Sequence, residues 1–315
     1  MKYRNLGKSG LKISEISLGS WLTYGNSVEK ERAVKTIDKA YDLGINSFDT
    51  ANVYAQGEAE KIVGPALNKY PRDSYVLATK AYWPMGDGPN DRGLSRKHIY
   101  EQVNQSLKRL NHDYVDIFYC HRFDQDTPLE ETLRTIDDMV RQGKVLYVGV
   151  SEWTAYQIVE GLRVQDKFLL DHIVVNQPIY NLFNRYIEDN VVPTVLNNGL
   201  GLVVFSPLAQ GLLTGKYRKG QEIPEDSRAA DPDSNAWIKD MLTEENLEKV
   251  EQLIKIADDL DISMPQLSLA WILHQPGISS ALIGASKPEQ VEENVKAVDV
   301  ELSDELLDEI EELMS

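Results

Sequence analysis

The feature of this sequence that most constrains its fold is an alternation repeated along nearly the whole chain. Short apolar runs are each followed by a polar loop and then by a segment whose apolar residues recur at the helical period. Eight apolar runs have the length and residue types of strands: 16–18, 45–48, 75–79, 115–119, 145–150, 173–175, 202–205 and 280–283. The clearest helical segments are 29–43, 58–68, 95–110, 129–142 and 155–164, and Ser95, Gly44 and Gly143 fit helix ends.

Eight strand–helix alternations predict a single α/β domain over residues 1–315, a closed (β/α)8 TIM barrel. A doubly wound dinucleotide-binding sheet is the main alternative, but it requires a G-x-G-x-x-G turn after its first strand, and the sequence has none there. Residues 2–13 alternate polar and apolar side chains and predict an N-terminal β-hairpin. After the seventh strand, a loop rich in Gly, Pro, Asp and Ser runs from 206 to 243, and such length is typical of a lid or binding loop.

Titratable side chains gather where three successive strands end. Asp49 and Tyr54 follow the second strand, while Lys80 and His121 end the third and fourth, on the face where such barrels carry their active sites. Singly, Asp49 could be a turn cap, Tyr54 a packing residue and His121 a structural histidine.

Together these four residues predict proton donation to a carbonyl oxygen. Lys80 would lower the pKa of the Tyr54 phenol, and Asp49 would keep the buried ammonium charged. His121 would hold the carbonyl oxygen near the phenol. Hydride would have to come from a cofactor, because no side chain can supply it.

The end of the last strand predicts a phosphate site. Gly284, Ser286 and Lys287 lead into a helix that Pro288 is suited to begin, and the backbone N–H groups at a helix start favour an anion.

Two other segments resemble known motifs only in part. Residues 211–216 are one residue short of a phosphate-binding loop, and Trp153 stands where a hydrolase nucleophile elbow requires Gly.

Four stretches of the chain, FDTANVYAQGEAE, LATK, IFYCHR and LIGASKPEQVEEN, resemble the aldo-keto reductase superfamily. The closest resemblance is to the branch that contains the β subunits of voltage-gated potassium channels and their bacterial relatives. It implies NADP(H) as cofactor and reduction of small aldehydes or ketones to alcohols, with Tyr54 as general acid. The alternative is a nucleotide-binding auxiliary subunit that senses redox state for a membrane protein. His121 favours the enzyme, because the channel subunits have Asn at that position.

The resemblance also implies which residues contact the cofactor. Two of them depart from common family choices: Phe205 stands where the channel subunits have Trp, and Glu152 stands where many relatives have Asn or Arg. The implied cofactor residues are Ser151, Glu152, Gln177, Phe205, Ser206, Pro207, Leu208, Gln210, Lys216, Arg228, Gly284, Ser286, Lys287, Gln290, Glu293 and Asn294. The substrate pocket is expected to depend on Trp21, Tyr24, Trp83, Phe123 and the long loop.

Charge and cysteine content limit the classes of binding partner and the cellular location that can be expected. The chain has 33 Lys and Arg against 50 Asp and Glu, a net charge of −17, which disfavours binding to nucleic acid and stable association with anionic membranes. Its one cysteine, Cys120, can form no intrachain disulfide, and the sequence has no signal peptide or membrane-spanning run. A cytoplasmic protein with a small carbonyl substrate and no metal is expected, and a homo-oligomer is left open.

Overall fold

The strands of the computed structural model close into a barrel. The structure describes residues 1–25, 28–225, 227–231 and 235–315. The parallel strands are neighbours in the order β10, β3, β4, β5, β6, β7, β8, β9, and β10 pairs with both β3 and β9. They are β3 (Ile16–Gly19), β4 (Ser47–Asp49), β5 (Val76–Ala81), β6 (Val115–Cys120), β7 (Val145–Ser151), β8 (Ile173–Gln177), β9 (Gly201–Phe205) and β10 (Ile278–Gly284). The prediction of a (β/α)8 barrel is confirmed.

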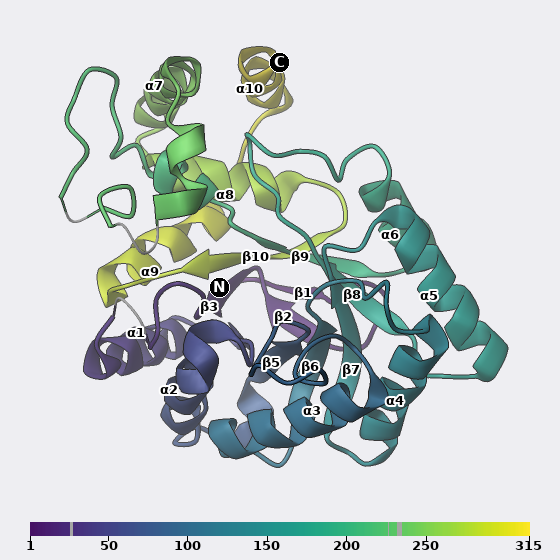
Figure 1. The fold of residues 1–315 in the computed structure, drawn as a ribbon. Helices are drawn as coiled ribbons and strands as arrows, with labels where there is room; N and C mark the ends of the chain where they lie inside the picture. Colours follow the sequence, from purple (N-terminus) through teal and green to yellow (C-terminus); the bar gives the residue numbers. More distant parts are fainter. Residues whose placement is uncertain (26–27, 226, 232–234) are drawn as a thin grey trace.

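Helices surround the strands (Figure 1). They are α1 (Lys30–Asp42), α2 (Glu58–Leu67), α3 (Arg96–Leu110), α4 (Leu129–Arg141), α5 (Ala155–Phe168), α6 (Val191–Asn198), α7 (Glu244–Asp259), α8 (Met264–His274), α9 (Pro288–Asn294) and α10 (Asp304–Met314). The helix ends that were predicted from a capping serine or a terminal glycine are confirmed. The Ser95 hydroxyl caps α3 by accepting a hydrogen bond from the His98 backbone N–H (3.3 Å), and Gly44 and Gly143 take positive φ just past α1 and α4. The end of α5 was misplaced, because Leu169 closes that helix in a left-handed conformation without a glycine to signal it.

The N-terminal hairpin pairs β1 (Tyr3–Asn5) with β2 (Lys12–Ser14), as predicted. Leu6 and Ile13 from this hairpin are fully buried in a small apolar cluster with Val76, Ala78, Ile117, Tyr119, Val175, Val203 and Leu282 of the barrel strands. Arg4 donates to the backbone carbonyls of Leu273 and Ile278, both at 2.8 Å. The hairpin therefore covers the N-terminal end of the barrel and leaves the C-terminal end for a site.

The long connection between β9 and α7 lies beside the barrel mouth. Its described part contains three 3-10 turns, Ala209–Thr214, Asn235–Trp237 and Lys239–Met241. The first buries Leu212 and Leu213 against the core, so this loop is attached to the barrel by packing. Within the ranges that the structure describes, no helix is long and apolar enough to cross a bilayer.

Close contact between α2 and α3 depends on a glycine. A Cβ atom at Gly64 of α2 would lie 2.0 Å from the carbonyl oxygen of Leu110, the last residue of α3. Backbone atoms cannot rotate away as a flexible side chain can, so any larger residue must push the two helices apart.

We expect Gly64→Ala to lower the free energy of unfolding by about 1–3 kcal/mol, the usual cost of overpacking. Denaturant unfolding followed by circular dichroism measures this change. Gly10→Ala is the matched control, since no heavy atom lies within 4 Å of a Cβ built there. Equal stability of the wild type and Gly64→Ala would show that the helices can separate at little cost.

Candidate active site

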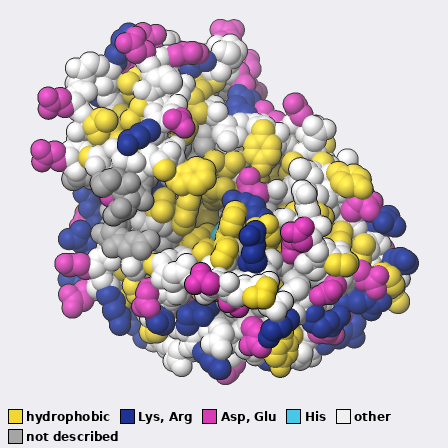
Figure 2. All heavy atoms as spheres, viewed as in Figure 1, with side chains coloured by type: hydrophobic (Ala, Val, Ile, Leu, Met, Phe, Trp, Pro, Cys, Tyr) yellow, Lys and Arg dark blue, Asp and Glu magenta, His cyan; other side chains and the backbone are white. Residues whose placement is uncertain are grey.

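A cavity of about 1490 Å³ opens at the C-terminal end of the barrel. It exceeds the range of roughly 300–1,000 Å³ that is common for small-molecule sites, so it has room for a large ligand together with a small one. Figure 2 shows it as a hollow with hydrophobic walls and cationic side chains beside it. Residues from the ends of the barrel strands, the long connection and α9 form its wall.

A buried ion pair lies at the base of this cavity. The Lys80 ammonium on β5 is fully buried and donates to Oδ1 of Asp49, at the end of β4. It also donates to the Thr50 carbonyl (3.0 Å) and to the Tyr54 hydroxyl (3.3 Å). The other carboxylate oxygen, Oδ2 of Asp49, accepts from Nε2 of Gln177 on β8 (3.0 Å). Three strands thus hold Tyr54 in place through one connected set of polar contacts.

The pKa of Tyr54 differs from the sequence-based expectation. Burial raises the pKa of this phenol well above its ordinary value, and the Asp49 carboxylate raises it further, whereas Arg122 opposes the shift. Lys80 was expected to lower it, but the ammonium is paired with Asp49, and the pair presents little net charge to the phenol. Burial also lowers the pKa of Lys80 itself, against the opposing effect of Asp49. Tyr54 is therefore held protonated at neutral pH.

His121 follows β6 and faces the same phenol. Its ring meets that of Tyr54 edge to face at 5.7 Å between centroids, and the ring of Trp83 lies 6.3 Å away on another side. Burial lowers the pKa of His121 well below its ordinary value, and the charges of Lys80 and Arg122 lower it further. The imidazole is therefore neutral at neutral pH. Its Nδ1 is buried without a hydrogen-bond partner in the described structure, which leaves Nε2 to contact a ligand.

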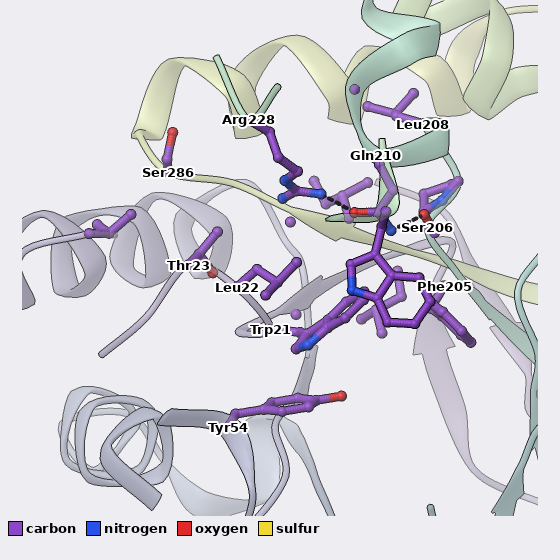
Figure 3. Close-up of a pocket in the computed structure, with 18 of the residues that line it drawn as sticks. Trp21, Leu22, Thr23, Tyr54, Phe205, Ser206, Leu208, Gln210, Arg228 and Ser286 are labelled. Carbon is purple, nitrogen blue, oxygen red and sulfur yellow. Dashed lines mark hydrogen bonds between the residues drawn. The ribbon is translucent and has the colours of Figure 1, made fainter. Parts of the chain in front are cut away.

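Aromatic side chains divide the cavity into two ends. Trp21 lies edge to face against Phe205 and against Trp237 of the long connection, both at 6.3 Å between centroids. Figure 3 shows Tyr54 on one side of this aromatic group and Arg228 and Ser286 on the other.

The end of the cavity away from Tyr54 is polar. Arg228 donates to the side-chain oxygen of Gln210, and Nε2 of Gln210 donates to the Ser206 hydroxyl at 2.6 Å (Figure 3). The backbone N–H of Ser286 donates to the side chain of Gln290 at 2.8 Å. Burial lowers the pKa of Arg228, so this cation is partly desolvated. Lys216 and Lys287 lie in the same cavity wall.

Several residues in the cavity wall have strained backbones. Leu22, Gln56, Ser206 and Gln210 all take positive φ, between 52° and 60°. Each such conformation costs on the order of 1–3 kcal/mol and persists only where surrounding contacts enforce it, a pattern common at functional sites.

Most of the residues expected at the site lie in the cavity wall. They are Trp21, Asp49, Tyr54, Trp83, His121, Ser151, Gln177, Phe205, Ser206, Pro207, Leu208, Gln210, Lys216, Arg228, Gly284, Ser286, Lys287, Gln290, Glu293 and Asn294. Lys80 lies behind the wall and reaches the site through Asp49 and Tyr54.

Three expected residues lie elsewhere. A turn closed by the hydrogen bond from the Tyr24 N–H to the Ser20 carbonyl (3.2 Å) leaves the Tyr24 ring buried in the hydrophobic core. Phe123 packs against Trp153 at 4.9 Å between centroids. Glu152 has a left-handed backbone, and its carboxylate accepts from the Ile179 N–H (2.6 Å) instead of facing the cavity.

Arg122 and Trp237 are among the wall residues that the sequence analysis did not find. Arg122 directly follows His121, so the rule that found His121 at a strand end would have found it. Trp237 lies in the irregular long connection, where no periodicity signals which residue turns inward. In the parts of the chain that the structure describes, no group of three or more His, Cys, Asp or Glu side chains is arranged to hold a metal ion.

Comparison with known proteins covers nearly the entire chain. The family model described as the aldo/keto reductase family matches residues 15–315. A protein of Arabidopsis thaliana named as a probable voltage-gated potassium channel subunit beta is 46% identical over 319 residues, which cover 100% of this chain and 97% of the relative. A protein of Oryza sativa with the same name is 46% identical over 99% of this chain and 96% of its own length. A Schizosaccharomyces pombe protein, also named for a voltage-gated potassium channel subunit beta, is 42% identical over 99% of this chain and 93% of its own length. The chain belongs to the aldo/keto reductase family.

Proposed function

We propose that this protein reduces small aldehydes or ketones to alcohols with NADPH as the hydride donor. The observation that carries the proposal is the connected set of Asp49, Lys80, Tyr54 and His121 at the base of one large cavity. A protonated phenol and a neutral imidazole both face the same space, and these are the two groups that a carbonyl oxygen needs when its carbon accepts hydride.

The chain's own residues perform the proton chemistry. Tyr54 donates a hydrogen bond, and then its proton, to the oxygen that becomes the alcohol. Lys80 stabilises the tyrosinate left behind, because its ammonium lies 3.3 Å from the phenol oxygen. His121, with its proton on Nε2, donates a second hydrogen bond that orients the carbonyl.

The polar end of the cavity fits a dinucleotide. Lys216, Arg228 and Lys287 supply positive charge for phosphates, and Phe205 offers an aromatic face for the nicotinamide ring. Gln177 and Ser151 line the same cavity and would hold the carboxamide. When bound, NADPH supplies hydride to the carbonyl carbon.

A second candidate function is supported by the names of the relatives, which are given as potassium channel β subunits. A subunit of this kind would bind the nucleotide and pass its redox state to a membrane partner. His121 favours the enzyme, because it supplies the donor that orients a carbonyl. Turnover of several aldehydes with kcat above about 1 s⁻¹, in the usual range for enzymes, supports the first function. Tight NADPH binding with negligible turnover supports the second.

A small carbonyl substrate and a cytoplasmic location belong to the same proposal. The net charge of −17 supports the expectation that neither nucleic acid nor an anionic membrane is a stable partner, since both would be repelled.

Replacing Tyr54 with Phe removes the proton donor and retains the ring. We expect carbonyl reduction to fall by about 10²–10⁴-fold, with NADPH affinity close to that of the wild type. Steady-state kinetics and fluorescence quenching by NADPH measure the two quantities. A Tyr54→Phe protein that kept about a tenth or more of the activity would show that another group donates the proton.

The pH dependence follows from the directions of the two shifts. Tyr54 can donate only below its pKa, which burial raises above the ordinary value, so loss of the Tyr54 proton should cause no decline in reduction up to about pH 9. His121 is neutral above its pKa, which burial lowers, so no loss is expected on going down to about pH 6.5. We therefore expect a flat profile of kcat/KM for reduction between these values. A limb with its midpoint near pH 7–8 would contradict the direction given for Tyr54.

Preference for NADPH over NADH should depend on Arg228 and Lys287. The two cofactors differ by the 2′-phosphate, and α9 has only seven residues, so we assign the preference to these side-chain charges and not to the helix itself. Losing one charge-assisted contact costs roughly 1.5–3 kcal/mol, about ten- to a hundredfold in affinity. Titration of both cofactors should show that Arg228→Ala/Lys287→Ala weakens NADPH binding selectively.

Lys255→Ala is the matched control, because it removes an exposed cation of α7 that lies outside the cavity wall. Equal wild-type affinity for NADH and NADPH, or an unchanged preference in the double variant, would refute this assignment.

A further inference from the structure

Arg122 is a cation in the cavity wall at the end where Tyr54 and His121 meet. It directly follows His121 after β6, and adjacent Cα atoms are about 3.8 Å apart. Its guanidinium carbon lies 5.5 Å from the ring centroid of Trp83, and that ring is in turn 6.3 Å from the ring of His121. The three side chains therefore border one small region of the cavity.

No carboxylate among the described residues forms an ion pair with Arg122. Among the residues that the structure describes, eight other arginines do form such pairs, each with Asp or Glu. The one hydrogen bond that Arg122 donates within the described structure goes to the backbone carbonyl of His121. In a chain with a net charge of −17, a half-buried guanidinium without an acidic partner needs a reason.

The cofactor does not provide that reason. Lys216, Arg228 and Lys287 already supply cations for its phosphates, and Figure 3 shows Arg228 across the aromatic group from Tyr54. An anion that pairs with Arg122 must therefore belong to a different molecule, bound beside Tyr54 and His121.

The geometry of Arg122 suits a planar or multi-oxygen anion. A guanidinium has five N–H donors in a fixed fork, and only one is used by the His121 carbonyl. Such a fork binds carboxylate or phosphate through two parallel hydrogen bonds. Stacking on Trp83 restrains the guanidinium and reduces the entropy lost when an anion binds.

We propose that Arg122 binds a carboxylate or phosphate group on the carbonyl substrate, and so makes short anionic aldehydes or ketones the preferred substrate class. This inference rests on the proposed reductase function and adds the charge of the substrate to it. Because Arg122 and His121 are adjacent, the anionic group and the carbonyl are separated by only a few bonds.

The test compares substrates that differ only in charge. With NADPH present, kcat/KM is measured for 4-oxobutanoate, for its neutral methyl ester and for 3-oxopropyl phosphate. We expect the wild type to prefer 4-oxobutanoate or the phosphate over the ester by about ten- to a hundredfold, the value of one charge-assisted hydrogen bond. The anionic substrate with the higher kcat/KM shows whether Arg122 prefers a carboxylate or a phosphate.

Arg122→Gln should reduce this preference to about threefold or less, mainly through a higher KM for the anions. Any general effect on catalysis cancels in the ratio of anion to ester. Arg122→Lys keeps the charge but loses the fork, so its ratio should be intermediate. Arg92→Gln is the matched control, since it removes an exposed arginine from the loop between β5 and α3 outside the cavity wall and should leave the ratio at the wild-type value.

A binding measurement accompanies the kinetics. Quenching of tryptophan fluorescence measures the affinity for 4-hydroxybutanoate, the product. This affinity should be about tenfold lower in Arg122→Gln than in Arg92→Gln. An unchanged anion-to-ester ratio in Arg122→Gln, or a wild type that prefers the ester, overturns the inference. Failure of the wild type to reduce any of the three carbonyl compounds overturns the proposed function instead.

Discussion

The active end of this barrel depends on keeping one lysine ammonium charged inside the protein. Lys80 is fully buried, and removing an ammonium from water costs several kcal/mol unless strong partners compensate. Asp49 supplies the opposite charge, and the Thr50 carbonyl and the Tyr54 hydroxyl accept the other hydrogen bonds of the Lys80 ammonium. Breaking such a pair leaves an uncompensated buried charge, so the positions of β4, β5 and the turn that carries Tyr54 are coupled to one another.

The same ion pair determines the protonation of its neighbours. Because Asp49 balances Lys80, burial dominates at Tyr54 and raises the pKa of its phenol. His121 has no carboxylate of its own in the described structure, so burial and nearby cations lower its pKa. Both groups are therefore uncharged at neutral pH. A change of burial at this end of the cavity would alter both shifts together, since one low-polarity environment causes both.

Positive charge in the cavity wall is divided between its two ends. Lys216, Arg228 and Lys287 lie with the polar residues of the long connection and α9, whereas Arg122 lies with Trp83 and His121. Figure 3 shows Trp21 and Phe205 between Tyr54 and Arg228, and Trp237 contacts Trp21 edge to face. This division allows two anionic groups to bind in one cavity without sharing a cation.

The sequence by itself determined the barrel and the order of its chemical groups. Periodicity is a local property, so the apolar runs and helical segments were enough to predict strands such as β6 and helices such as α3. Strand ends are also local, and because parallel strands end on one face, Asp49, Lys80 and His121 could be expected together. Only the tertiary structure decided which neighbouring side chains face inward. Tyr24 is buried in the core, and Phe123 packs against it at Trp153. Glu152 turns toward Ile179, and Trp237 reaches the cavity from a loop without periodicity. It also decided the direction of the Tyr54 pKa shift. That direction depends on burial and on the ion pair between Asp49 and Lys80, and both arise from strands packed together in space and not from any one segment of the chain.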